Sequence, residues 1–174
     1  MKTIVTTTFI FLLSVFVSAS HAANWPNWRG PNHDGSTISK KSPPVKFDAK
    51  NGVKWSIRLP GPSAATPIVL DDRVFASSVE ITDKKSGKGK LLAICLDRAS
   101  GKILWDRNAG SGYRPGKGDG FDYQLDSRTT YASPSPVTDG NIVVFFYGNG
   151  DLVTYDMGGK ELWRRNVQKE YGDF

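Results

Sequence analysis

The chain has 174 residues, with 23 basic and 17 acidic side chains and a net charge of +6. Its single cysteine, Cys95, excludes a fold held together by internal disulfides, so stability has to come from packing. The basic residues are scattered apart from a cluster at 84–90, which we interpret as a solvated hairpin tip, and we therefore expect no nucleic-acid binding.

Residues 1–22 have the layout of a secretory signal peptide. A positive charge at Lys2 precedes the apolar run Phe9–Val17, and Ser20 and Ala22 supply the small side chains of a cleavage site after Ala22. The run is shorter than the ~20 residues of a membrane-spanning helix, and no cysteine near the cut offers a lipid attachment point. We expect an exported protein, periplasmic or secreted, with no membrane anchor after cleavage.

The mature part of the sequence shows strand patterns and little helical periodicity. The stretch VKWSIRL at 53–59 alternates apolar and polar side chains, which predicts a half-buried strand. The continuous apolar runs at 91–96 and 142–147 predict strands buried on both faces. The predicted fold class is therefore all-β.

Two long segments repeat the same order of strands and turns. The first reads ATPIVLDDRVFASSV and, after a hairpin loop, LLAICLDRASGKILWDRN; the second reads PSPVTDGNIVVFFYGNGDLVTYDMGGKELWRRN. Each predicts four strands joined by three tight turns, and Trp105 and Trp163 close the two units. Four-stranded repeats of about 40 to 50 residues are typical of β-propeller blades.

The last turn of each unit carries the candidate structural residues. An aspartate is expected to accept hydrogen bonds from the turn amides, and a glycine to adopt the positive φ at which the chain reverses. A tryptophan on the closing strand is suited to filling the wedge between neighbouring blades. In the two units these residues are Asp97, Gly101, Trp105, Asp156, Gly159 and Trp163.

LLAICLDRASGKILW and LVTYDMGGKELW resemble the repeat of the pyrroloquinoline-quinone (PQQ)-like β-propeller proteins, whose blades carry Ala-x-Asp-x-x-(Thr/Ser)-Gly-Lys-x-x-Trp. The first copy keeps this spacing, and the second lacks one turn residue. NWPNWRGPNHDG at 24–35 is similar to the segment before the first blade in many secreted members. The resemblance implies an N-terminal segment at 23–52 and an incomplete propeller at 53–174.

In this family the repeat tryptophan docks on the glycine turn of a neighbouring blade. The resemblance therefore implies that Trp105 and Trp163 are docking rings and that Gly101 and Gly159 are turn partners. Propellers have four to eight blades, whereas this sequence has about two and the stretch 53–59, which in such folds often pairs as the outer strand of the last blade. We accordingly expect the N-terminal part of a longer protein.

The leading functional hypothesis is a non-catalytic exported scaffold that binds a protein or another extracellular ligand through its inter-blade loops. No catalytic set and no cofactor ligands are identified. The alternative is a PQQ- and calcium-dependent dehydrogenase with its active site in further blades; related dehydrogenases use an adjacent Cys-Cys pair, which this sequence lacks. A carbohydrate-binding or hydrolytic propeller would need paired carboxylates facing the channel, and none can be assigned to that position.

The long loop between the units offers two weaker motifs. GSGYRPGKGDG at 110–120 lacks the first glycine and the final Ser or Thr of a phosphate-binding loop. Asp119, Asp122 and Asp126 do not have the spacing of an EF-hand calcium loop. We interpret this segment as a solvated inter-blade loop, of the kind that often carries binding function on a rigid scaffold.

Overall fold

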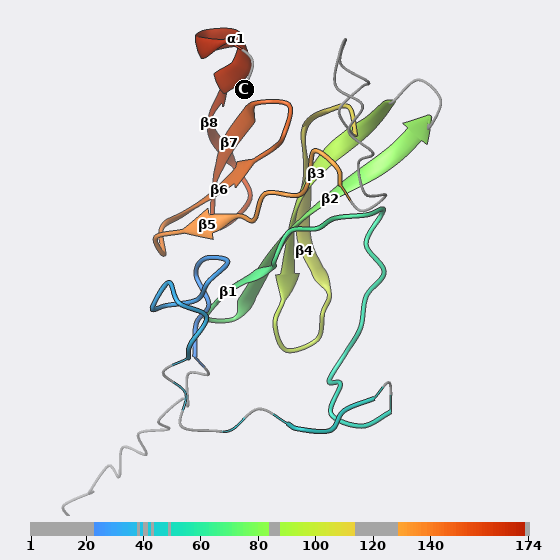
Figure 1. The fold of residues 1–174 in the computed structure, drawn as a ribbon, viewed down its shortest axis with the longest axis vertical. Coiled ribbons are helices and arrows are strands. Elements are labelled where there is room, and N and C mark those ends of the chain that lie inside the picture. Colours follow the sequence, from blue (N-terminus) through green and yellow to red (C-terminus); the bar gives the residue numbers. More distant parts are fainter. Residues whose placement is uncertain are drawn as a thin grey trace, which may run out of the picture.

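A computed structural model describes residues 23–37, 39, 42, 44–48, 50–83, 88–113 and 129–172. They form two four-stranded antiparallel sheets, each with its strands in chain order (Figure 1). The first contains β1 (Ile68–Leu70), β2 (Arg73–Asp83), β3 (Lys88–Asp97) and β4 (Ile103–Ser111). The second contains β5 (Val137–Thr138), β6 (Ile142–Phe146), β7 (Asp151–Asp156) and β8 (Glu161–Asn166), followed by the short helix α1 (Val167–Tyr171). The all-β class and the two four-stranded propeller blades are as predicted.

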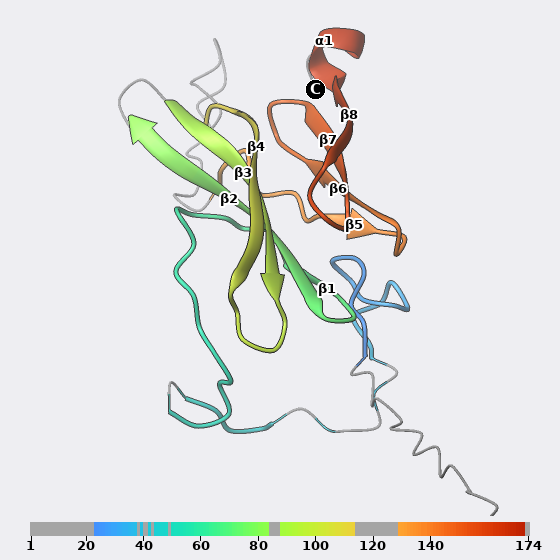
Figure 2. The same cartoon turned by 180° about the vertical axis from the view of Figure 1, so that it is seen from behind.

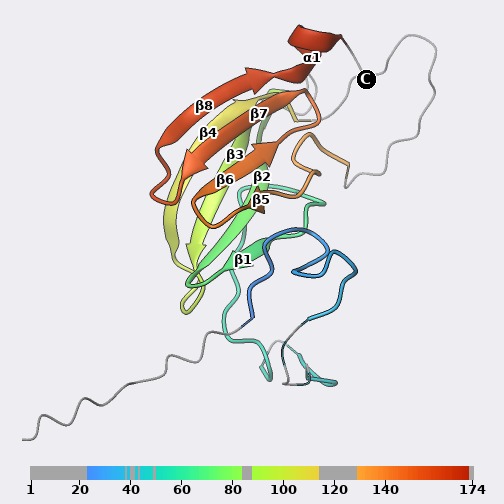
Figure 3. The same ribbon diagram turned by 90° about the vertical axis from the view of Figure 1, so that its left-hand side faces the viewer.

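The two sheets lie face to face and share one core (Figure 3). In the first sheet, Phe75 pairs with Cys95 and Cys95 with Trp105, so the three side chains line the same face. In the second sheet, β6 and β7 direct aromatic and branched side chains at that face. The buried apolar residues of β6 and β7 and the turn between them are Val143, Phe145, Tyr147, Val153 and Tyr155.

The other face of the first sheet is covered by residues 53–59, which run along the side opposite the second sheet (Figure 2). The predicted alternation is present here, because Trp55, Ile57 and Leu59 pack on an apolar cluster from β2 and β3. The prediction of a strand at 53–59 is nevertheless wrong. The segment crosses the face of the sheet, where its amides reach no neighbouring strand among the described residues, and Val53 is 42% exposed.

The apolar runs differ in their burial. All six residues of 91–96 are buried within β3, as predicted. In β6, Val143 and Phe145 are buried, but the alternate residues are only half-buried, so the prediction of burial on both faces is wrong for 142–147. Among the described residues no layer covers this second face, whereas the first sheet has one on each side.

The N-terminal segment extends the first sheet by one residue pair. Trp25 exchanges backbone hydrogen bonds with Val69 of β1, with N–O distances of 2.7 and 2.9 Å. The predicted signal peptide lies outside the described residues. So do residues 84–87 of the basic cluster and the three aspartates of the long loop.

Burial of Cys95 predicts a pH effect on stability. Desolvation raises the pKa of its thiol from 9.0 to about 11. Between these values the unfolded chain loses the proton and the folded chain keeps it, so the free energy of unfolding should fall as the pH rises above 9. Urea unfolding from about pH 8 to about pH 10.5 measures this. C95A should show a shallower decline, and equal slopes for both proteins would contradict the prediction.

Candidate functional site

The contact between the sheets is centred on Trp105. Its indole Nε1 donates a hydrogen bond of 3.0 Å to the carbonyl of Met157, in the turn between β7 and β8. The ring lies directly on Gly159, so that a Cβ at this position would be 2.7 Å from it. Three aromatic rings surround the indole at centroid distances of 5.7 to 6.5 Å: Phe75, Phe145 and Tyr155. The first blade is thereby held on the turn of the second.

Trp55 repeats this arrangement on the first sheet. Its Nε1 donates a hydrogen bond of 2.9 Å to the carbonyl of Arg98, and a Cβ on Gly101 would be 2.6 Å from its ring. Sequence reasoning assigned 53–59 to a strand and missed this role for Trp55. The available indication was Gly52-Val53-Lys54-Trp55, which has a glycine, a lysine and a tryptophan in the order of the Gly-Lys-x-x-Trp pattern but with a different spacing.

Trp163 lies in a different environment. Its register partner Thr154 alternates with the inward-facing Val153 and Tyr155, so Trp163 is on the face turned away from the first sheet. Its side chain is 42% exposed. The docking role that the family resemblance implies for Trp163 remains a prediction.

Each glycine turn is shaped by its aspartate. The Asp97 carboxylate accepts a hydrogen bond of 2.7 Å from the Ser100 amide, and the Ser100 side chain lowers the pKa of this carboxyl. The Asp156 carboxylate accepts one of 2.9 Å from the Lys160 amide. The φ angles of Gly101 and Gly159 are 73° and 82°, a region that favours glycine.

Two arginines of the first sheet add further bonds to the turn at 156–160. Arg73 donates to the Met157 carbonyl at 2.8 Å, and Arg107 donates to the Gly159 carbonyl at 2.7 Å. The Arg107 guanidinium also lies 5.7 Å from the Trp105 ring centroid. The turn carbonyls between the sheets are thus paired with donors of the first blade.

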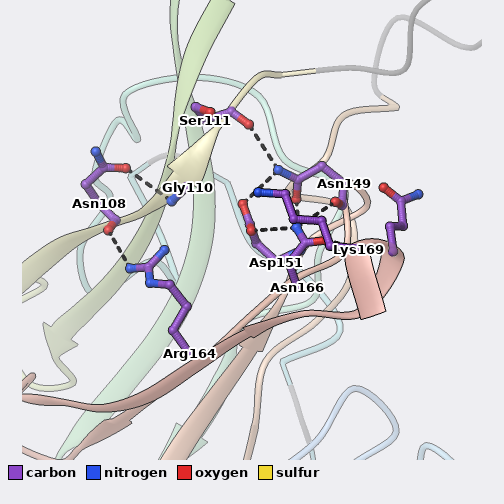
Figure 4. A pocket seen from close by; sticks show the side chains of 9 residues that line it. Asn108, Gly110, Ser111, Asn149, Asp151, Arg164, Asn166 and Lys169 are labelled. Atoms are coloured by element: carbon purple, nitrogen blue, oxygen red, sulfur yellow. Dashed lines mark hydrogen bonds between the residues drawn. The ribbon is translucent and has the colours of Figure 1, made fainter. Parts of the chain in front are cut away.

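A polar cleft of about 720 Å³ opens at the other end of this contact, between β4, β8 and α1 (Figure 4). Its volume lies within the range of ligand pockets, although its lining is more polar than is usual for them. The side chains come from both sheets and from the helix. The lining residues are Asn108, Gly110, Ser111, Asn149, Asp151, Arg164, Asn166, Gln168 and Lys169.

Asp151 occupies the centre of the cleft. One carboxylate oxygen accepts a hydrogen bond of 2.9 Å from Asn166, and the other accepts one of 2.8 Å from Asn149 (Figure 4). A Cβ on Gly110 would be 2.1 Å from this carboxylate, so only glycine allows β4 to approach so closely. β4 of the first blade therefore contacts Asp151 of the second blade directly at the cleft.

Arg164 forms the side of the cleft and connects the two outer strands. Its guanidinium donates to the carbonyls of Ala109 and Asn108 in β4 and to the Glu161 carboxylate, 2.9 Å away. These partners occupy the donors of Arg164 and neutralise its charge. Lys169 has no such partner: its ammonium forms no hydrogen bond or ion pair within the described part of the chain.

Sequence reasoning did not find the cleft. Its residues carry no known motif, but each unit continues from its tryptophan as Trp-x-Arg-Asn, which places Asn108 and Asn166 at equivalent positions. Both asparagines line the cleft. A repeated polar residue at this offset was the available sequence indication.

The protein-family model described as "Outer membrane protein assembly factor BamB" matches residues 39–173. The chain belongs to this family. It thus belongs with the PQQ-like β-propeller proteins, as its repeats predict.

One solved structure that the chain matches is the crystal structure of BamB from Moraxella catarrhalis. The identity is 20% and the TM-score 0.37, over 63% of this chain and 29% of that one. The chain thus spans less than a third of the length of that BamB. No curated protein matches the sequence.

The described residues lack two further features. None of their helices has the length and apolar character needed to cross a membrane. Nor do these residues contain three or more His, Cys, Asp or Glu side chains grouped so that they could hold a metal ion.

The buried ring of Trp105 predicts a large stability effect. Trp105→Ala should lower the free energy of unfolding by about 3 to 5 kcal/mol, because it removes the ring that fills the space between the blades. Urea denaturation followed by circular dichroism measures the change. The matched control, W163A, removes a ring that is 42% exposed and should cost less than W105A. A loss below about 1 kcal/mol for W105A, as at ordinary surface sites, would contradict the inter-blade role.

Substituting two glycines with positive φ distinguishes the stability cost of backbone strain from the cost of a collision with the Trp105 ring. Gly140 has a φ of 102°, and a Cβ added to it would meet no other atom within 4 Å. Gly140→Ala should therefore cost only about 1 to 2 kcal/mol of backbone strain. Gly159→Ala carries a similar strain and also collides with the Trp105 indole, which should add about 1 to 3 kcal/mol. Thermal melts compare the two variants, and equal losses would argue against a tight ring contact.

Proposed function

We propose that the chain is part of an exported, non-catalytic β-propeller scaffold that binds a protein partner at the boundary between its blades. One observation carries this proposal: the inter-blade contact is fixed by tryptophan, arginine and glycine contacts at one end and leaves an open polar cleft at the other. A rigid framework with polar groups held at its edge is suited to recognition.

The bonding within the cleft favours binding over catalysis. A general base needs a carboxylate free to accept a proton from a substrate, and both oxygens of Asp151 already accept hydrogen bonds from asparagine amides. Arg164 is held by Glu161 and two carbonyls. Export is supported by the predicted signal peptide, and a protein partner by membership of a family described as an outer membrane protein assembly factor.

Photo-crosslinking tests the binding role. A benzophenone amino acid at Gln168, in the cleft, should give a discrete adduct with another protein when cells that make the full chain are irradiated. The matched control places the same group at Lys160, on the opposite end of the β7–β8 hairpin, and should give no such adduct. Identical adducts at both positions, or none at Gln168, would count against the proposal.

A cofactor titration of the same protein distinguishes the binding scaffold from the dehydrogenase alternative. Titration with PQQ in the presence of Ca²⁺, followed by tryptophan fluorescence, should give no saturable change for a binding scaffold. Saturable binding with a quinone-type absorbance would instead favour the dehydrogenase.

A further inference from the structure

We propose that the inter-blade cleft binds a carboxylate side chain from an acidic segment of the partner protein. The inference rests on the proposed binding function and names the chemistry that this site would recognise. It follows from which hydrogen-bonding groups in the cleft are already used and which are left.

The acceptor groups of the cleft are largely occupied. The side-chain oxygen of each asparagine accepts a backbone N–H: Asn108 from Gly110 at 3.2 Å, Asn149 from Asp151 at 3.2 Å, and Asn166 from Lys169 at 2.9 Å. The Asp151 carboxylate accepts hydrogen bonds from the side-chain amides of Asn149 and Asn166. These bonds orient every asparagine with its oxygen turned toward the protein.

The groups that remain are mainly donors. Within the described residues, the Asn108 amide nitrogen and the Lys169 ammonium make no hydrogen bond, and the side chains of Ser111 and Gln168 are also without partners. Of the charged groups in the lining, Lys169 is the one that forms no hydrogen bond or ion pair with another side chain in this part of the chain. A ligand that brings an accepting, negatively charged group satisfies these donors best.

Other ligand classes fit less well. A phosphate is usually bound by an arginine with free guanidinium donors or by several cations. Arg164 already donates to Glu161 and to two carbonyls, so it is not available for a phosphate. A sugar is usually covered on its apolar face by an aromatic side chain, and the described residues that line the cleft include none. A single ammonium beside an amide and a hydroxyl matches one carboxylate of an acidic side chain.

The helix fixes the backbone of Lys169 beside the cleft. The Asn166 side chain caps α1 by accepting the Lys169 amide and at the same time donates to Asp151 in the cleft (Figure 4). The backbone amide of Lys169 is therefore held beside the cleft by the same residue that donates a hydrogen bond to the Asp151 carboxylate. The backbone from which the lysine side chain extends thus needs no ordering on binding.

Fluorescence anisotropy with a labelled octaglutamate peptide tests the proposal. The purified full chain should bind this peptide saturably and octaglutamine at least ~10-fold more weakly, and salt should weaken octaglutamate binding. Lys169→Gln should reduce the affinity about 10-fold, in the range of one charge-assisted hydrogen bond. Lys169→Arg should keep most of it, and Asn108→Ala should reduce it.

The control variant is Lys160→Gln, which removes an equal charge from the far end of the same hairpin and should leave the affinity unchanged. Thermal melts establish that each variant is folded. Equal losses for K169Q and K160Q would show general charge attraction and overturn the site, as would no octaglutamate binding by the folded protein. If the crosslinked adduct at Gln168 persists in that case, the binding function stands and only its carboxylate chemistry is wrong; if the adduct is absent too, both fail.

Discussion

The structure depends on an indole ring placed flat on a glycine turn. Trp105 on Gly159 and Trp55 on Gly101 have the same geometry, with an indole N–H bonded to a turn carbonyl and no room for a Cβ beneath the ring. The ring can approach so closely only because the turn needs positive φ and so carries glycine. One residue type thus satisfies the backbone conformation and the inter-blade contact together.

This contact also fixes the polar cleft. β4 carries Trp105 and, three residues later, Asn108, so docking the ring on the second blade sets the position of the asparagine at the far end of the strand. Gly110 then allows β4 to meet Asp151 directly. Because the ring, the asparagine and the glycine share one strand, a shift at the tryptophan would displace the cleft. Structure and proposed recognition are coupled through β4.

The sequence predicted the fold class and the order of strands because these follow from local patterns that occur twice. The residue types in the turns at 97–101 and 156–159 favour only a few backbone conformations, so the turns could be predicted. The role of residues 53–59 could not be read in the same way. Alternation shows that one face of the segment is buried, but not whether its amides find a neighbouring strand, which depends on packing far along the chain. The cleft was missed for a similar reason, since its residues meet only when the two blades stack.

The docking contact has a direction, and this makes the two faces of the stack chemically different. Each blade presents a glycine turn toward one side and a tryptophan toward the other, so Trp55 fills the turn of the first sheet while Trp163 projects from the second. A contact of this kind joins unlike surfaces and repeats head to tail. The cleft is asymmetric in the same way. Asn108 comes from the blade that supplies the ring, and Asp151 and Lys169 come from the blade that supplies the turn. A ligand bound there touches both blades, so its affinity should respond to the packing of Trp105 as well as to the cleft residues themselves.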